Sequence, residues 1–211
     1  MNIGDDRMKA SKLLKFVGVG MVFSSFLFAC SHKDSDVKTI GVLQYMEHGA
    51  LDAAYEGFIA GLAEEGYIEG ENIKIDLKNA QGDLTTAQTI ANQYVSDDVD
   101  MMFAIATQAV QSAYNATKDI PILMTAVTDP VEAGVVKDWN QSGTNVTGTS
   151  DLTPVAKQME LITELVPEAK TVGVIYTTSE VNSEVQVKMA EEAASNLGLQ
   201  VIRVGVTTVN D

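Results

Sequence analysis

TVGVIYTTSE, residues 171–180, decides the fold prediction because it repeats a pattern that the chain has already used. The earlier copy begins at Thr39 with TIGVL, 132 positions upstream, and in both copies a glycine follows the first threonine by 27 positions, at Gly66 and at Gly198. An apolar run, an amphipathic helix and a glycine that stops it therefore occur twice. We interpret the two copies as one β-α-β unit that is built twice.

Apolar runs and helical patterns alternate through the rest of the first half. The order βαβαβαβ predicts a parallel sheet with helices on both faces. The apolar faces of the two copied helices also correspond, since Tyr55, Phe58 and Leu62 align with Val187, Ala190 and Ala194. Strands are predicted at 38–45, 73–77, 101–106, 122–124 and 201–206, and helices at 51–65, 85–95, 109–117 and 182–197.

The residues between the two similar units are numerous enough to complete a sheet of their own. We therefore predict two lobes and not one longer sheet. The fold class is therefore α/β, with two doubly wound parallel-sheet lobes joined by a hinge. We expect the first lobe at residues 37–149 and the start of the second at 150–211, with the crossover in the Gly-, Asn- and Thr-rich stretch 140–149. One β-α-β unit is too small to stand alone, so we expect the second lobe to be incomplete and the chain to be C-terminally truncated.

The N-terminal residues predict an exported protein. A basic start between Arg7 and Lys15 precedes Phe16–Ala29, an uncharged run too short to span a bilayer, which is typical of a signal peptide. Cys30, the only cysteine in the chain, follows at once and resembles the modified cysteine of a bacterial lipobox. We therefore predict a lipoprotein signal peptide at 1–29 and a lipidated tether at 30–36; an ordinary signal peptide with an incidental cysteine is the alternative. Two acyl chains on Cys30 would anchor the protein stably.

Composition and motifs exclude several functions. A net charge of −15 argues against nucleic acid as a partner. The sequence contains no dinucleotide fingerprint, phosphate loop or nucleophile elbow. The chain's 2 histidines, His32 and His48, offer no metal cluster. We therefore predict no enzyme activity, no metal and no cofactor.

Polar residues follow the predicted strands at the edge where open parallel sheets bind ligands. Thr107 and Gln108 open a helix whose free N–H groups suit a carboxylate, and Asp129 is an acid placed to meet an ammonium, so the set suits a zwitterion. Thr107, Asp129 and Ser183 also have a structural alternative as helix caps or turn formers. The candidates are Gln44, Tyr45, Thr107, Gln108 and Asp129 in the first lobe and Asn182 and Ser183 in the second; His48, Asp52, Thr125, Thr128 and Thr177 also lie near strand ends.

Three segments carry a family resemblance: PILMTAVTDPVEAGVV (121–136), NVTGTSDLTPVAKQMELI (145–162) and VGVIYTTSEVNSEVQVKMAEEA (172–193). They resemble the substrate-binding lipoproteins of bacterial ABC importers, and more narrowly the family that includes tryptophan- and tyrosine-binding members. The resemblance implies two hinged lobes that close on a ligand, with an amino acid, aromatic or apolar, as the ligand. It also implies that seven residues of this chain line the cleft: Thr107, Gln108, Asp129, Ser150, Asp151, Asn182 and Ser183.

The resemblance also implies the partners and the location. An ABC permease and its ATPase would receive the solute, and the lipid anchor would keep the protein on the extracytoplasmic face of the cell membrane. A signalling lipoprotein of the same fold without a transport role is the alternative, and a doubly wound enzyme is less expected.

Overall fold

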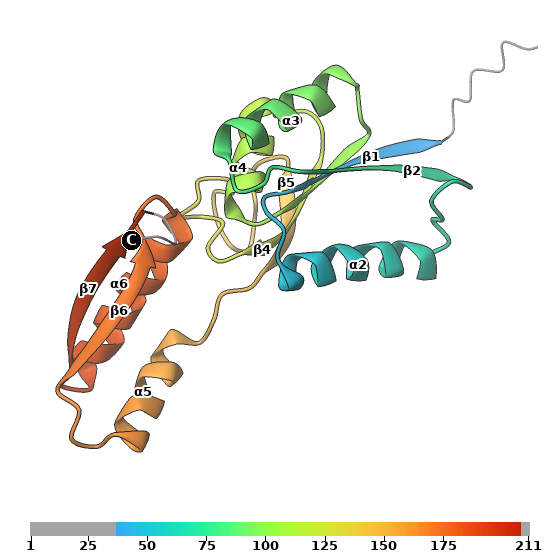
Figure 1. The fold of residues 1–211 in the computed structure, drawn as a ribbon. Helices are drawn as coiled ribbons and strands as arrows, with labels where there is room; N and C mark the ends of the chain where they lie inside the picture. Colours follow the sequence, from blue (N-terminus) through green and yellow to red (C-terminus); the bar gives the residue numbers. More distant parts are fainter. Residues whose placement is uncertain (1–36, 208–211) are drawn as a thin grey trace, which may run out of the picture. The chain divides into compact units, whose positions relative to one another are not determined.

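The computed structural model describes residues 37–207, which form two separate parallel sheets (Figure 1). The first sheet has five strands in the order β2-β1-β3-β4-β5, and the second pairs β6 with β7. The predicted signal peptide, the tether and Cys30 lie outside the described residues. Among residues 37–207, no helix combines the length and the hydropathy that a membrane span requires.

The elements follow the predicted order, with two additions. The strands are β1 (Lys38–Gln44), β2 (Ile73–Asn79), β3 (Met101–Ile105), β4 (Ile122–Val127), β5 (Val146–Ser150), β6 (Thr171–Thr177) and β7 (Gln200–Val206). The helices are α2 (Gly49–Glu64), α3 (Leu84–Ser96), α4 (Thr107–Ala116), α5 (Val155–Leu165) and α6 (Val181–Asn196).

Helices cover both faces of the five-stranded sheet, as the alternating pattern predicts. Helix α2 packs on one face, where Phe58 stacks on Phe103 with ring centroids 4.0 Å apart. Helices α3 and α4 pack on the other face against Leu43, Met102 and Ala104. Every strand pair in the sheet is parallel, so the carboxyl ends of the strands all lie at one edge.

Tyr94 on α3 fixes the position of β1. Its ring is fully buried, and its hydroxyl lies 2.9 Å from the carbonyl oxygen of Val42 and 2.7 Å from that of Asp76. Burial raises the pKa of Tyr94 well above its usual range, so the phenol remains a neutral donor. A Cβ on Gly41 would lie 2.8 Å from the Tyr94 ring, which explains why a glycine occupies this strand position.

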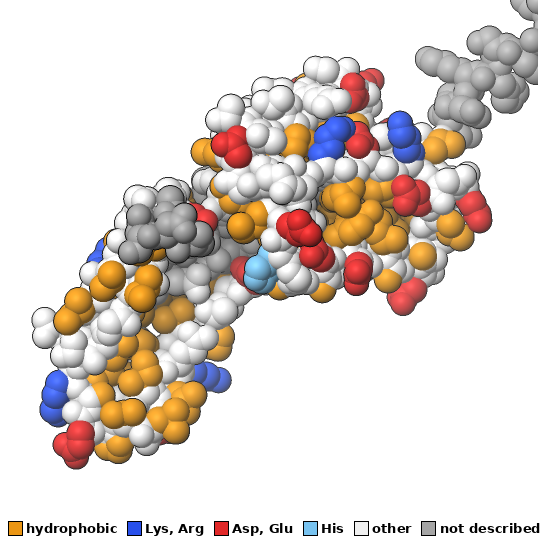
Figure 2. Space-filling view, viewed as in Figure 1, with side chains coloured by type: hydrophobic (Ala, Val, Ile, Leu, Met, Phe, Trp, Pro, Cys, Tyr) orange, Lys and Arg blue, Asp and Glu red, His pale blue; other side chains and the backbone are white. Residues whose placement is uncertain are grey.

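The second sheet repeats the β-α-β unit. The helix face of Val187, Ala190 and Ala194 is buried, as the alignment with α2 predicts. Gly66 and Gly198, just past the ends of α2 and α6, both have positive φ (85° and 72°), a conformation that favours glycine at a helix end. The face of β6 and β7 that carries Ile175, Ile202 and Val204 remains exposed, and Figure 2 shows hydrophobic side chains gathered on the second sheet.

Two separate sheets confirm the central expectation, because the block that begins at Thr171 does not extend the first sheet. The placement of the crossover in residues 140–149 was wrong in part, since Val146–Ser150 forms β5 and pairs with β4. Only Val146 of that strand is buried, so the alternation that marks a half-buried strand is absent. Helix α5 was also missed.

The close approach of Gly41 to Tyr94 makes a testable prediction. Gly41→Ala would force the buried ring to move, and we expect it to lower the free energy of unfolding by about 1–3 kcal/mol. Gly57→Ala is the matched control, because a Cβ at this position of α2 meets nothing within 4 Å. Urea unfolding of both variants measures the difference, and equal stability of the two variants would contradict the packing argument.

Candidate functional site

The carboxyl edge of the five-stranded sheet collects most of the predicted ligand-binding residues. Strand register places Gln44 of β1 beside Ile105 of β3, and Ile105 beside Thr125 of β4. Val127, at the end of β4, pairs with Ser150 of β5. Gln44, Tyr45, Thr107, Gln108, Asp129, Ser150 and Asp151 therefore follow or end four strands at the same edge.

Three buried polar side chains at this edge have an atom without a hydrogen-bond partner. Gln44, Thr107 and Thr128 are only 3%, 4% and 7% exposed. No partner is present in residues 37–207 for Oε1 of Gln44 or for the hydroxyls of the two threonines. None of the three atoms is completely enclosed, so water or a ligand can reach each of them. Buried polar groups are normally paired, and an unpaired group that solvent can reach indicates a binding position.

The N-terminus of α4 at the same edge presents free donors. Its N-cap residue is Ala106, which has no side chain to accept a hydrogen bond from the first turn. The N–H groups of Thr107, Gln108 and Ala109 have no partner among the described residues. Ala106 also has φ of 85°, a strained conformation for a residue other than glycine, and Ala126 at the end of β4 has φ of 55°. Strain of this kind persists where surrounding structure enforces it, and it is frequent at binding sites.

Gln44 and Tyr45 differ in what they can offer a ligand. The Nε2 of Gln44 donates to Oδ1 of Asp52 at 2.7 Å and to the carbonyl oxygen of Met46 at 2.9 Å, which leaves Oε1 available. The Tyr45 hydroxyl donates to the carbonyl oxygen of Gly82 at 2.8 Å, and burial raises its pKa. Tyr45 therefore offers its half-buried ring and not a free hydroxyl.

Asp129 is a turn former in addition to any role with a ligand. Its Oδ1 accepts from the N–H groups of Val131 at 2.9 Å and Glu132 at 3.0 Å, the structural alternative considered for this residue. Oδ2 has no partner within residues 37–207, so half of the carboxylate remains available. Ser150 is also occupied, since its hydroxyl donates to the carbonyl oxygen of Thr128 at 2.8 Å and accepts from the N–H of Leu152 at 3.0 Å.

The remaining candidates lie more openly. Asp151 is exposed, and its backbone N–H donates to the carbonyl oxygen of Val127 at 3.3 Å, while its carboxylate makes no hydrogen bond in the described part of the chain. Asn182 and Ser183 lie in the first turn of α6, beyond the carboxyl end of β6, and both donate to a carboxylate oxygen of Glu180, at 3.4 and 3.5 Å. The Oδ1 of Asn182 is buried and unpaired.

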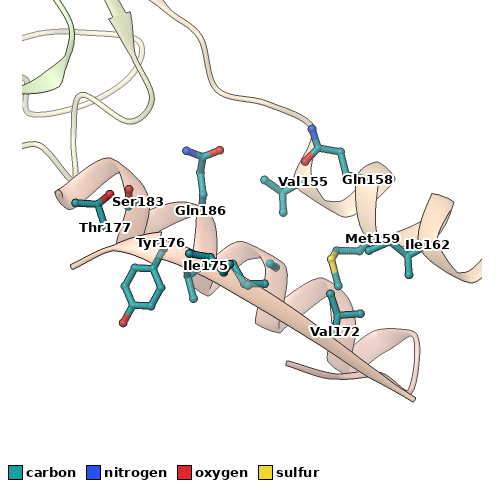
Figure 3. Close-up of a pocket in the computed structure, with 13 residues that line it drawn as sticks. Val155, Gln158, Met159, Ile162, Val172, Ile175, Tyr176, Thr177, Ser183 and Gln186 are labelled. Carbon is teal, nitrogen blue, oxygen red and sulfur yellow. The ribbon is translucent and has the colours of Figure 1, made fainter. Parts of the chain in front are cut away.

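A cavity of about 440 Å³ lies between β6, α5 and α6 (Figure 3). Its polar end is formed by Thr177, Ser183 and Gln186, and apart from Gln158 and Tyr176 the rest of its wall is apolar. Val155 and Met159 in that wall also belong to the hydrophobic core of the second sheet. In the described part of the chain β6 pairs with β7 alone, whereas β1 has a partner on each side. We therefore interpret most of this cavity as an open core surface and only its polar end as part of a site.

The sequence analysis placed Thr128 and Asp52 near strand ends but did not include them among the expected site residues. Thr128 follows β4 by one residue, and only its burial distinguishes it from the other threonines of this edge. Asp52 lies in the first turn of α2, where acidic residues are common for local reasons. Among residues 37–207, no group of three His, Cys, Asp or Glu side chains could hold a metal ion.

Comparison with known proteins identifies the family. The model of the ABC transporter substrate binding protein family matches residues 39–211. This chain belongs to that family. The tyrosine-binding protein of Clostridioides difficile (strain R20291) is 46% identical over 217 residues, which cover 97% of this chain and 63% of that protein. The chain thus spans less than two thirds of the length of this curated family member.

Two solved structures of similar proteins agree with the fold. An ABC domain from Streptococcus pneumonia in complex with L-Trp is 44% identical, with a TM-score of 0.79 over 82% of this chain and 59% of that one. A ligand-free, open substrate-binding protein with adhesive properties from Clostridium difficile is 54% identical, with a TM-score of 0.66 over the same shares, 82% and 59%. The family assignment and the α/β fold with parallel sheets therefore rest on both sequence and structure.

The unpaired hydroxyl of Thr107 makes a prediction that distinguishes a binding residue from a structural one. Thr107→Val keeps the shape and removes a buried hydroxyl that bonds to nothing in the described structure, so we expect the free energy of unfolding to stay the same or to rise by up to about 1 kcal/mol.

Thr117→Val is the matched control. The Thr117 hydroxyl accepts from the N–H groups of Asp119 at 3.1 Å and Ile120 at 3.2 Å, so its loss should cost about 1–3 kcal/mol. Thermal or urea unfolding measures both variants. A cost at Thr107 as large as that at Thr117 would show that the Thr107 hydroxyl already has a structural partner.

Proposed function

We propose that the full-length protein is an extracytoplasmic binding protein that captures an amino acid and delivers it to an ABC permease and its ATPase. The observation that carries this proposal is the carboxyl edge of the five-stranded sheet, where the buried side chains of Gln44, Thr107 and Thr128 present unpaired polar atoms. These groups have lost most of their contact with water without gaining a protein partner, a cost that a bound ligand would offset.

The N-terminus of α4 suits the carboxylate of the ligand. Three consecutive N–H groups, from Thr107 to Ala109, are free, and the helix dipole places partial positive charge at this point. The Thr107 hydroxyl is a fourth donor beside them. A carboxylate here would accept several hydrogen bonds without the burial of an uncompensated charge.

In this proposal the ammonium group of the ligand binds to the carboxylate of Asp129. Its Oδ2 is unpaired within the described residues, while Oδ1 keeps the following turn in place. In the proposed complex Ser150 and Asp151 line the cleft near the crossover, and Asn182 and Ser183 close on the ligand from the second lobe. Gln108 contributes its N–H, and its half-buried side chain borders the same edge.

The side chain of the ligand is proposed to be aromatic or apolar. Two similar proteins support this class, one called a tyrosine-binding protein and one solved with L-Trp. The half-buried ring of Tyr45 at the end of β1 offers a surface for stacking, because its hydroxyl is already directed to Gly82. We propose binding without chemical conversion, in keeping with the family, and therefore no catalytic residue.

The proposal places the protein on the outer face of the membrane through a lipid on Cys30. The basic start, the short apolar run and the single cysteine directly after it support this anchor. The two acyl chains of a thioether-linked diacylglycerol would anchor the receptor stably and keep it close to its permease.

Asp129 supplies the test of the ligand class. Asp129→Asn keeps an oxygen for the turn and removes the charge, so the full-length variant should bind L-tyrosine and L-tryptophan at least about tenfold more weakly. Isothermal titration calorimetry measures the change. Asp138→Asn is the control, since Oδ1 of Asp138 makes a similar turn contact with the N–H of Asn140 at 2.8 Å but follows no strand end. Unchanged affinity in Asp129→Asn would remove this residue from the site.

Cys30→Ala tests the anchor separately. The variant should lose incorporation of labelled palmitate in its native host and move from the membrane fraction to the soluble fraction, because the thiol is the proposed attachment point. Ser31→Ala, which leaves the thiol in place, should still be labelled. A variant without Cys30 that is still labelled and still sediments with membranes would refute lipidation at this residue.

A further inference from the structure

The amide of Gln44 has one possible orientation. Its Nε2 lies 2.7 Å from Oδ1 of Asp52 and 2.9 Å from the carbonyl oxygen of Met46, and both partners are acceptors. The reversed amide would place an oxygen against two oxygens and lose both hydrogen bonds. Gln44 is also only 3% exposed, so its side chain has no room to swing away. The nitrogen is therefore committed to the protein, and Oε1 is the atom that remains.

Asp52 is itself fixed by the start of α2. Its N–H donates to the carbonyl oxygen of His48 at 2.9 Å, and the side chain of His48 accepts from the N–H of Ala50 at 3.2 Å. A carboxylate in the first turn is also favoured by the helix dipole. The first turn of α2 thus presents Asp52 to the end of β1 in a defined geometry.

We propose that Asp52 is a positioning residue that fixes Oε1 of Gln44 as an acceptor for the ammonium group of the ligand. This inference rests on the proposed function, in which the carboxylate binds at the N-terminus of α4. The ammonium lies one carbon away from that carboxylate, and Gln44 pairs in register with Ile105, two residues before Thr107. An ammonium has three donors and Asp129 has one free oxygen, so a second acceptor is required. Gln44 supplies it on the neighbouring strand.

The experiment compares an amino acid with its des-amino acid in the full-length protein. L-tyrosine and L-tryptophan are titrated beside hydroxyphenylpropanoate and indolepropanoate, which keep the carboxylate and the ring but lack the amine. Gln44→Met and Asp52→Ala should each weaken binding of the amino acid about tenfold or more and leave binding of the des-amino acid unchanged. The double variant should weaken binding no further than either single variant, because both remove one interaction.

Two further variants separate positioning from other roles. Asp52→Asn keeps an oxygen that can accept from Gln44 and should retain most of the affinity. Glu56 is an exposed acid of α2 whose side chain makes no hydrogen bond or ion pair within residues 37–207, so Glu56→Ala should change the affinity for neither ligand. An Asp52→Asn variant as weak as Asp52→Ala would mean that the charge of Asp52 acts directly, and equal losses for both ligands would mean a general structural effect; either result overturns the inference.

The outcome also distinguishes this inference from the proposed function. A wild-type protein that binds neither L-tyrosine nor L-tryptophan refutes both. A second outcome is that the wild type binds the amino acids and that Gln44→Met keeps the same ratio of affinities between amino acid and des-amino acid. This outcome leaves the proposed function in place and refutes only the role of Gln44 and Asp52. If Asp52→Ala does not fold, Gln44→Met alone decides the question, because methionine fills the same buried position.

Discussion

Parallel pairing of β1 with β3 and of β3 with β4 is the constraint on which the site depends. It brings residues that are tens of positions apart in the sequence to one edge, and each strand end contributes a different kind of group. Strand β1 ends in an amide oxygen, β3 leads into the free donors of α4, and β4 is followed by a carboxylate. The packing that maintains this pairing, with Tyr94 against Gly41 on one face and Phe58 on Phe103 on the other, therefore also maintains the relative positions of donors and acceptors.

The same edge carries a cost in stability. Gln44, Thr107 and Thr128 are buried as deeply as core residues, yet each leaves a polar atom unpaired, and Ala106 and Ala126 add backbone strain. A chain selected for stability alone would place apolar side chains and glycines at these positions. The concentration of these unfavourable features at the ends of three adjacent strands is a stronger argument for a binding site than any one residue.

Much of the fold could be predicted from the sequence, because periodicity reports burial. The repeated β-α-β unit and the glycines after α2 and α6 correctly predicted two separate sheets. Strand β5 could not be found in this way, since its residues after Val146 are exposed and show no alternation. For the site, the strand-end rule located Gln44, Thr107 and Asp129, but it could not tell which atoms are occupied. Asp129 uses one oxygen for a turn, and Asp52 fixes the orientation of the Gln44 amide. Both facts depend on how side chains of different elements meet in space, which no local sequence pattern encodes.

The two copies of the unit are not equivalent, and the difference bears on how a ligand would be bound. In the first copy β1 lies between two strands and its polar end is buried, so its free acceptor has a fixed position. In the second copy the Nδ2 of Asn182 and the hydroxyl of Ser183 donate to Glu180, at 3.4 and 3.5 Å, whereas the Oδ1 of Asn182 is buried and unpaired. Polar groups that are fixed and unpaired contribute most to the free energy of binding, whereas groups with internal partners must give up one hydrogen bond to form another with the ligand. Under the proposed function, the five-stranded sheet therefore supplies most of the contacts to the charged groups, because the free N–H groups of α4 and the free oxygens of Gln44 and Asp129 all lie at its edge. The start of α6 adds one buried acceptor, the Oδ1 of Asn182.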